Sequence, residues 1–326
     1  MRASLRIGIV TPARRGSHAG NRVTAERWAR LLQSLGHQAA VTSLYQREPF
    51  DLLVALHARK SFPSVRRFRR ERPDSAIVVA LTGTDLYADL RKSVHARRSL
   101  EIADRLVLLQ SEGRRELPAP FRTKARVIHQ SAVAPRGLFR PRANGFDVVV
   151  LSHLRAVKDP LRAAKAARLL PGSSRLRVLH AGAALSTAWA QAARREEKDN
   201  PRYRWLGPRS HSDSLRLLAR ARALILTSRL EGGANVVSEA LACSIPVVSS
   251  RIPGSVGLLG RGYPGYFEVG DTHALAALFS RLESDPAFLR RLRERVRVLG
   301  RLVSPARERA SWMRLLRELR RGSREN

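Results

Sequence analysis

Short apolar runs alternate along the chain with longer stretches in which apolar residues recur every three or four positions. Short runs bounded by Gly or Pro are typical of buried strands, and the longer period is typical of helices that cover a sheet. A first series of strands is predicted at 5–10, 38–44, 52–56, 76–81, 105–109 and 125–128. A second series is predicted at 148–152, 176–181, 203–206, 223–227 and 246–249.

Helical stretches separate the predicted strands. After the first strand, a loop with Gly16 and Gly20 leads into a helix whose apolar side runs from Val23 to Leu35 and which ends at Gly36. In the second half, helices are expected at 160–169, 186–197, 212–220, 236–242 and 273–282, and Pro305 begins a last one. Alternating strands and helices predict an α/β protein with parallel sheets.

A segment with two prolines and two glycines, Pro135–Gly145, lacks apolar periodicity and is typical of a linker. It predicts an N-terminal Rossmann-like domain over 1–143 and a C-terminal one over 144–303. A helix over 304–326 could pack back on the N-terminal domain. Two such domains in succession enclose a cleft between the carboxyl ends of their strands.

The chain of 326 residues is strongly basic, with 61 Lys and Arg against 27 Asp and Glu and a net charge of +34. Such a charge favours polyanionic partners, nucleic acid among them. However, residues 1–143 carry 28 basic and 11 acidic side chains and residues 144–326 carry 33 and 16, so no tail concentrates the charge. We therefore interpret the excess as a bias towards Arg on exposed faces, including the helix face 65–72, and expect no nucleic acid as partner.

Only one cysteine, Cys243, is present, which excludes an intrachain disulfide and a Cys-based zinc site. No apolar run approaches the roughly 18 residues of a membrane span, and the apolar stretch at the start is too short for a signal peptide. We expect a cytoplasmic protein without a membrane span.

The segment from Thr227 to Ser250 carries the most chemical information. It runs from a strand through Glu231-Gly-Gly-Ala-Asn into a helix that holds Glu239, and it ends at Pro246 before the next strand. Backbone amides of such a turn and the positive end of the helix dipole suit a phosphate. A carboxylate such as that of Glu239 can accept two hydroxyl hydrogen bonds from a ribose diol, whereas a capping or surface Glu is the structural alternative.

This segment resembles the signature of the GT-B glycosyltransferases of the family 4 type, roughly E-G-x-G-x-x-x-x-E-A-x-A-x-G-x-P-V-V. The chain departs from it at Ala234 and Ser244, where the family usually has Gly. Leu151-Ser-His-Leu-Arg155-Ala-Val-Lys158 is similar to the segment whose Arg and Lys hold the donor diphosphate, although either could be a surface cation. Trp205-Leu-Gly207-Pro-Arg209 matches the segment beside the nucleotide base, and residues 16–22 occupy the place of the first Gly-rich loop.

Within this family, the chain resembles the selenosugar synthases of selenoneine biosynthesis, in 20–28, 56–61, 81–87, 231–239 and 252–267. The resemblance implies a UDP-sugar donor, UDP-N-acetylglucosamine or UDP-glucose, and selenophosphate as acceptor. The implied catalytic residues are Arg155, Lys158 and Glu231. The implied donor-binding residues are Gly20, Arg155, Lys158, Arg209, Glu231, Gly232, Gly233, Ala234, Asn235 and Glu239. The acceptor-binding residues expected at strand ends of the N-terminal domain are Asn21, Arg22, His57, Arg59, Lys60, Thr84 and Asp85.

A selenium nucleophile that already carries negative charge needs no strong general base, so stabilisation of the departing UDP should dominate. His57 could instead be a structural histidine, and Thr84 part of an ordinary polar turn. The sequence contains no Asp-x-Asp motif and no cluster with metal-ligand spacing, so we predict a metal-independent enzyme without cofactor. Two alternatives remain open: the same donor with a thiol, carboxylate or sugar hydroxyl as acceptor, and a basic protein that binds nucleic acid.

Overall fold

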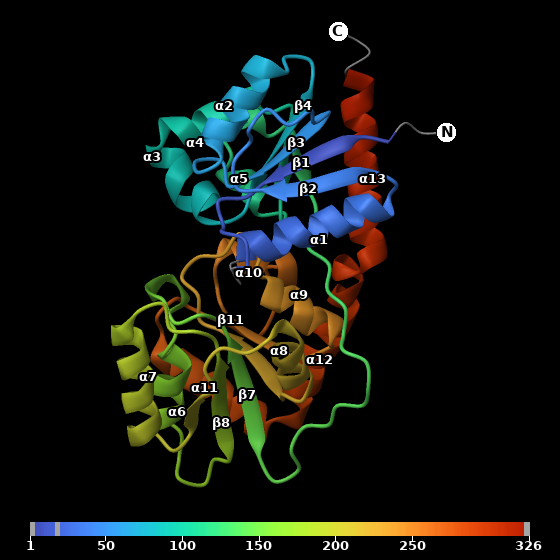
Figure 1. Ribbon diagram of the computed structural model, residues 1–326. Coiled ribbons are helices and arrows are strands. Elements are labelled where there is room, and N and C mark those ends of the chain that lie inside the picture. The colour runs from blue at the N-terminus through green and yellow to red at the C-terminus, as the bar shows by residue number, and fades with distance from the viewer. Residues whose placement is uncertain (1–3, 17–19, 323–326) are drawn as a thin grey trace. The chain divides into compact units, whose positions relative to one another are not determined.

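Two parallel sheets organise the chain in the computed structural model, which describes residues 4–16 and 20–322. One unit comprises Met1–Gln130 and Pro305–Asn326, and the other comprises Ser131–Ser304. Each unit contains a six-stranded sheet with helices packed against it (Figure 1). The predicted α/β class with two Rossmann-like domains is confirmed.

The sheet of the first unit has the strand order β2-β1-β3-β4-β5-β6. Its strands are β1 (Arg6–Val10), β2 (Gln38–Thr42), β3 (Leu52–Leu56), β4 (Ala76–Leu81), β5 (Arg105–Leu108) and β6 (Ala125–Val127). Its α-helices are α1 (Gly20–Ser34), α2 (Phe62–Glu71), α3 (Leu90–Lys92), α4 (Val94–Ile102), α5 (Gly113–Glu116) and α13 (Pro305–Gly322). Short helical turns are η1 (Asp85–Asp89) and η2 (Ala119–Phe121). All neighbouring strands are parallel, so the carboxyl ends of β1, β3 and β4 lie at one edge of the sheet.

The C-terminal helix α13 lies beside α1 (Figure 1). The rings of Trp28 and Trp312 meet edge to face with centroids 4.9 Å apart, and both side chains are fully buried. Glu308 accepts hydrogen bonds from Trp28 Nε1 at 2.8 Å and from Arg27 at 3.2 Å. The last helix therefore completes the core of the first unit, although the whole second unit, Ser131–Ser304, precedes it in the chain.

The boundary between the units differs from the expected end of the first domain at residue 143. Gln130 Nε2 donates to Thr24 Oγ1 at 2.6 Å, which ties residue 130 to the first unit. Ala132 N donates to Val303 O at 3.0 Å, so the chain joins the second unit from Ser131 onward. The Pro- and Gly-containing segment thus belongs to the second unit.

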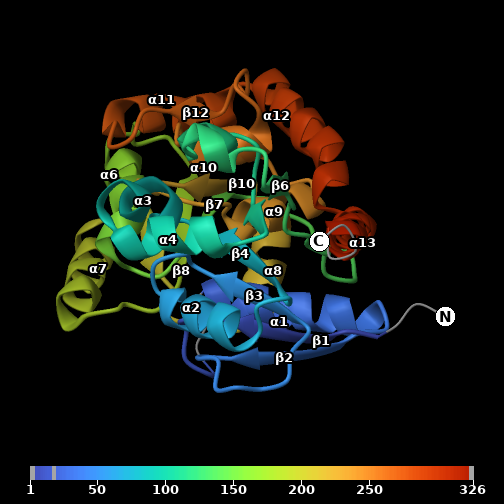
Figure 2. The ribbon, with the colours of Figure 1, turned by 90° about the horizontal axis from the view of Figure 1, so that it is seen from above.

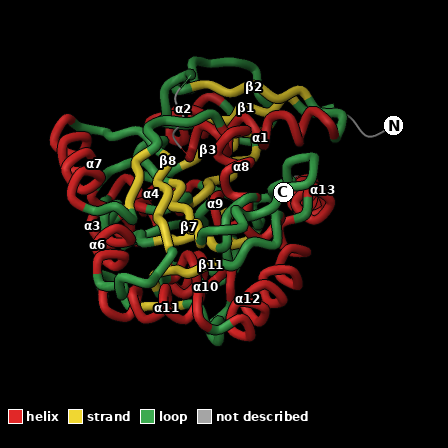
Figure 3. The backbone as a smooth tube through the Cα atoms, turned by 90° about the horizontal axis from the view of Figure 1, so that it is seen from below, coloured by secondary structure: helices red, strands yellow, loops and turns green. Residues whose placement is uncertain are grey.

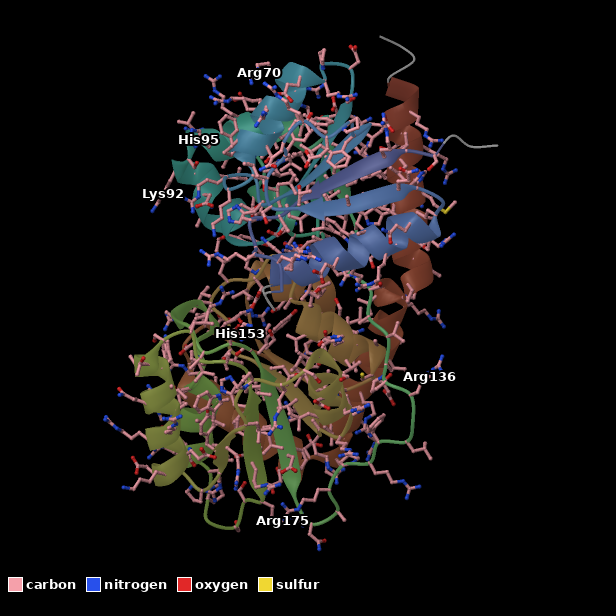
Figure 4. All side chains as sticks on the ribbon, viewed as in Figure 1. Arg70, Lys92, His95, Arg136, His153 and Arg175 are labelled. Atoms are coloured by element: carbon pink, nitrogen blue, oxygen red, sulfur yellow. The ribbon has the colours of Figure 1, made fainter. Side chains whose placement is uncertain are left out.

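On the opposite side of the first sheet, α2 and α4 lie next to one another, as Figure 2 shows from above. Val65 and Phe68 of α2 are fully buried, and the ring of Phe62 stacks on His95 of α4 at 4.6 Å. Arg66 and Arg70 of α2 are exposed, and the side chain of Arg70 projects outward in Figure 4. The predicted solvated basic face of this helix is confirmed.

The sheet of the second unit has the order β12-β11-β10-β7-β8-β9. Its strands are β7 (Phe146–Leu151), β8 (Leu176–Ala181), β9 (Tyr203–Trp205), β10 (Ala223–Leu226), β11 (Val247–Ser250) and β12 (Tyr266–Phe267). Its helices are α6 (Arg162–Arg168), α7 (Thr187–Asp199), α8 (His211–Ala219), α9 (Asn235–Ala242), α10 (Pro253–Leu259), α11 (Thr272–Ser284) and α12 (Pro286–Leu299). Two short turns are η3 (Ala156–Lys158) and η4 (Gly300–Val303). The two-residue strand β12 was not predicted, because so short an element has no periodicity.

A buried histidine makes the stability of the second unit depend on pH. His180 of β8 is fully buried between Tyr203 OH at 3.0 Å and Ser152 O at 3.0 Å. Burial lowers the pKa of His180 from its ordinary 6.5 to about 4. The unfolded chain therefore binds a proton at a higher pH than the folded chain does, so the contribution of this group is present above pH 6.5 and is lost as the pH falls towards 4.

We expect the free energy of unfolding to fall by about 3 kcal/mol through His180 alone between pH 7 and pH 4. Urea titrations of the wild type and of His180→Gln at both pH values measure this slope. The variant should have the shallower dependence, because glutamine does not titrate. Equal slopes in the two proteins would contradict the assignment.

Candidate functional site

The loops after β7 and β10 form the predicted donor site of the second unit. These strands are parallel neighbours, so their carboxyl ends lie side by side. Thr227 Oγ1 donates to the carbonyl oxygens of Lys158 at 2.9 Å and Asp159 at 3.0 Å. Arg229 N donates to Val157 O at 2.8 Å. The sequence segments around 158 and 231, far apart in the chain, are thus joined by hydrogen bonds to the backbone carbonyls of residues 157–159.

Lys158 and Glu231, both predicted to be catalytic, form an ion pair at this junction. Their side chains are only 17% and 13% exposed. Ser228 Oγ donates to the same Glu231 oxygen at 2.7 Å, which orients the carboxylate. Because the pair is mostly shielded from water, the charge of either group acts strongly on anything that binds beside it.

The backbone of Glu231 is held in place from the other side by α10. A Cβ atom on Gly254, in the first turn of α10, would lie 2.2 Å from Glu231 O. Only glycine permits this approach. The Ile252-Pro-Gly segment, which the sequence resemblance singled out, therefore packs against the backbone of the loop that holds Glu231.

Asp159 follows Lys158 in a left-handed conformation with φ of 44°. Its carboxylate accepts from Arg162 Nε at 3.0 Å and lies 3.6 Å from Arg229. Arg162 in turn donates to Thr272 Oγ1 at 2.6 Å. A non-glycine residue rarely adopts this backbone, and these arginines help to hold it. Asp159 thus positions the turn that presents Lys158, a role that sequence reasoning missed.

Glu239 lies in α9, and its Oε1 is 2.9 Å from His211 Nε2 of α8. The Glu239 side chain is 16% exposed, whereas that of His211 is 69% exposed. Ala234 precedes the helix as its N-cap, and its carbonyl accepts from the amides of Val237 and Ser238. The predicted phosphate seat at Gly232, Gly233, Ala234 and Asn235 is therefore the turn that leads into this helix.

Arg155 and Arg209 stand apart from this ion pair. Arg155 is exposed in an extended conformation before η3, and its side chain has no hydrogen bond or ion pair with any residue that the structure describes. Arg209 is exposed in the loop after β9, close to Gly207 with its φ of 68°. Of the predicted cations of the donor site, the structure brings only Lys158 to Glu231.

In the first unit, Asp85 joins the loops after β3 and β4. Its carboxylate accepts from the backbone amides of Ala58 at 3.0 Å, Thr82 at 3.0 Å and Gly83 at 2.8 Å. Asp85 is fully buried, and burial raises its pKa, an effect that the amide donors and His57 oppose. Asp85 was expected to bind the acceptor, which stays a prediction; in the structure its carboxylate holds the two loops together through these amides.

His57 lies beside Asp85 at the end of β3 with φ of 74°. Its Nε2 is 3.2 Å from Thr84 Oγ1, and its Nδ1 accepts from Lys60 N at 3.4 Å. Burial lowers the pKa of His57, so the ring is neutral at neutral pH. Both ring nitrogens have partners within the first unit, which favours the structural alternative for this histidine.

Two of the other expected acceptor-binding residues, Arg59 and Arg22, form ion pairs with carboxylates of the first unit. Arg59 binds Asp89 at 2.9 Å. Arg22 is buried and binds Glu26 at 2.6 Å, one turn later in α1. Lys60 is exposed, and Asn21 follows Gly20, a residue predicted to bind the donor, at the start of α1. Residues 17–19 of the expected Gly-rich loop lie outside the described residues.

No group of three or more His, Cys, Asp or Glu side chains in the described ranges is arranged to hold a metal ion. Within the same ranges, no helix is long and apolar enough to cross a membrane. Cys243 is a free cysteine.

Comparison with known proteins defines the class of the fold. The structure is similar to that of Anabaena Alr3699/HepE in complex with UDP-glucose, with a TM-score of 0.76 and 16% identity over 96% of this chain and 100% of that one. It is also similar to a sucrose-phosphate synthase from Thermosynechococcus elongatus, with a TM-score of 0.75 and 14% identity over 98% and 100% of the two chains. A glycosyltransferase from Rickettsia africae ESF-5 gives a TM-score of 0.72 and 15% identity over 97% and 98%.

At this level of identity the likeness shows the fold, which is that of the GT-B glycosyltransferases. Residues 140–298 match the family model of the glycosyl transferases group 1. All of the matched residues lie in the second unit. No match was found among the curated proteins.

Proposed function

We propose that the protein is a selenosugar synthase that joins selenophosphate to the sugar of a UDP-sugar, UDP-N-acetylglucosamine or UDP-glucose. The selenium atom forms a bond to the anomeric carbon as the bond from that carbon to UDP breaks, and UDP leaves. Water then cleaves the selenium–phosphorus bond and releases phosphate. The arrangement that carries the donor half of this proposal is Lys158 and Glu231 at the carboxyl ends of β7 and β10, beside the turn into α9.

The donor half is supported by the matched family model over residues 140–298, which spans these groups. Lys158 would neutralise the departing diphosphate together with Arg155, and the amides of the turn at Gly232 would add hydrogen bonds. Glu239 would hold the ribose hydroxyls. In this proposal the protein's own cations do the work of a metal ion, so the rate should not change when EDTA is added.

The acceptor half rests on sequence resemblance at 56–61, 81–87 and 252–267. In the first unit, exposed Lys60 and the hydroxyl of Thr84 lie at the strand ends where a small anion would be bound. A negatively charged selenium nucleophile needs no base, which agrees with a neutral His57 whose nitrogens are both engaged. We also propose that the protein acts in the cytoplasm, where sugar nucleotides are available.

Product identification tests the proposal. The protein is incubated with UDP-N-acetylglucosamine or UDP-glucose and with selenophosphate, and UDP release and a selenium-bearing product are followed by mass spectrometry. UDP release with thiols or sugar hydroxyls but not with selenophosphate would favour the second candidate, a group 1 glycosyltransferase with another acceptor. Tight, salt-dependent duplex binding without affinity for UDP would favour a nucleic-acid-binding protein.

The role of Glu239 can be tested without knowledge of the acceptor. We expect Glu239→Ala to weaken UDP binding about tenfold or more in calorimetry, because hydrogen bonds to a charged group contribute about 1.5–3 kcal/mol. Glu294→Ala, on the exposed face of α12, is the matched control and should leave the affinity unchanged. If both variants bind UDP as the wild type does, the ribose does not lie at α9.

A further inference from the structure

A cavity of ≈560 Å³ lies on the second unit, over β7 and β8. It is enclosed by three segments: the stretch before β7, the two strands, and the end of α8 with the residues that follow it. None of its lining residues belongs to the proposed donor site, which is formed by the loops at the carboxyl ends of the strands. The cavity is therefore separate from the proposed donor site, and binding of the UDP-sugar does not account for it.

The floor of this cavity is apolar. Val149 of β7 and Leu179 of β8 are register partners in the parallel ladder, so their side chains share one face of the sheet. Leu217 of α8 lines the cavity beside them. Figure 3, which views the molecule from below, shows β7 and β8 adjacent to one another. Leu138, which also lines the cavity, is 93% exposed.

The rim of the cavity is positively charged. Arg140, Arg142 and Arg220 line it, and in the described part of the chain none of these three guanidinium groups has a carboxylate partner. The acidic lining residue, Asp147, is already bound by Arg177 through two hydrogen bonds of 2.8 and 3.0 Å. The field at the mouth of the cavity therefore favours an anion.

Arg220 is partly fixed in this position. Its guanidinium carbon lies 5.6 Å from the centroid of the Phe139 ring, the geometry of a cation–π contact. This contact joins Phe139, in the stretch before β7, to Arg220 at the end of α8. By contrast, Arg136, six residues upstream of Arg142, projects outward from the same stretch in Figure 4 and does not line the cavity.

The geometry points to a binding site for a single-chain amphipathic anion, an alkyl or acyl chain that carries a phosphate or carboxylate head group. The alkyl chain would cover the partly exposed Leu179 and Leu217, and the head group would bind between the arginines. The volume lies in the usual range for small-ligand sites, about 300–1,000 Å³. A second copy of the chain is a poor occupant, because each copy carries +34 and would repel the other at a basic rim.

Calorimetric titration with dodecyl phosphate, below the concentration at which it forms micelles, tests the proposal. We expect saturable binding whose affinity rises from butyl to dodecyl phosphate, because the longer chain buries more apolar surface. Arg140→Glu with Arg142→Glu should weaken the binding of dodecyl phosphate tenfold or more. UDP binding in this double variant should match the wild type, so failure here is distinguishable from failure of the proposed function.

A matched control separates the site from the general charge of the protein. Arg293→Glu with Arg295→Glu changes the net charge by the same amount on the exposed side of α12, and should leave dodecyl phosphate binding within twofold of the wild type. The proposal is overturned if both double variants lose affinity equally, or if inorganic phosphate or the uncharged dodecyl maltoside binds as tightly. Adsorption to vesicles of anionic phospholipid without binding of monomeric dodecyl phosphate would also overturn it.

Discussion

Lys158→Ala should lower kcat/KM for transfer from the UDP-sugar by about 10²–10³-fold, the usual loss when one group that stabilises developing charge is removed. Lys158 lies in a mostly shielded position against Glu231, where its charge acts in a low dielectric. The variant also leaves Glu231 without its cation, so the site would gain net negative charge where the diphosphate should leave. Steady-state measurement of UDP release quantifies the effect.

The control for this variant is Lys165→Ala, which removes the same side chain from an exposed position of α6. It should retain the wild-type kcat/KM. Lys158→Arg should recover part of the activity, because it restores the charge but not the geometry of a point cation. If Lys158→Ala keeps its activity within twofold, the charge on the leaving group is stabilised elsewhere, and Arg155 becomes the first residue to test.

Asp85→Ala should destabilise the first unit by about 3 kcal/mol or more, because each buried amide that loses its acceptor costs about 1–3 kcal/mol. The loss follows from the contacts of this carboxylate. Its removal leaves the amides of Ala58, Thr82 and Gly83 buried without an acceptor. Asp85→Asn keeps one carbonyl acceptor and should cost less, whereas exposed Asp74→Ala should change stability by less than about 0.5 kcal/mol.

To measure the stability of the first unit, its unfolding must be followed separately from that of the second unit. Trp28 and Trp312 lie in the core of the first unit, and the other two tryptophans, Trp189 and Trp205, lie in the second. In a Trp189→Phe, Trp205→Phe background, urea titration by fluorescence follows the first unit alone. An Asp85→Ala transition at the same urea concentration as its parent would show that the carboxylate is dispensable for these loops.

Much of the fold could be predicted because the apolar pattern has a local physical origin. Strands buried on both faces need continuous apolar runs, as in Leu52–Leu56, where every residue is fully or almost fully buried. Among the described residues, strands β1 to β11 were predicted within a few residues of their observed bounds, and β12 was missed because two residues show no periodicity. The place of α13 in the first unit could only be suggested, since the contact of Trp28 with Trp312 spans most of the chain.

The donor site was only partly predictable. Lys158 and Glu231 were recognisable because each lies in a segment that resembles a glycosyltransferase signature, and because a cation and a carboxylate suit the binding of a sugar diphosphate. The residues that position them were not. Asp159 is ordinary in sequence, and its left-handed backbone and two arginine partners exist only once β7 and β10 are adjacent. His211 likewise reaches Glu239 only through the packing of α8 on α9.

By itself, the sequence determined two parallel α/β units and a glycine turn that follows Glu231 and leads into the helix of Glu239, because these features depend on neighbours a few residues away. The tertiary structure alone decided which charges meet. Lys158 pairs with Glu231, Asp85 accepts three backbone amides, and three arginines without a carboxylate partner among the described residues line the cavity over β7 and β8. Charged and hydrogen-bonding groups interact only when the fold brings them within a few ångströms of each other. The order of the strands in each sheet decides which loops, and so which of these groups, are neighbours.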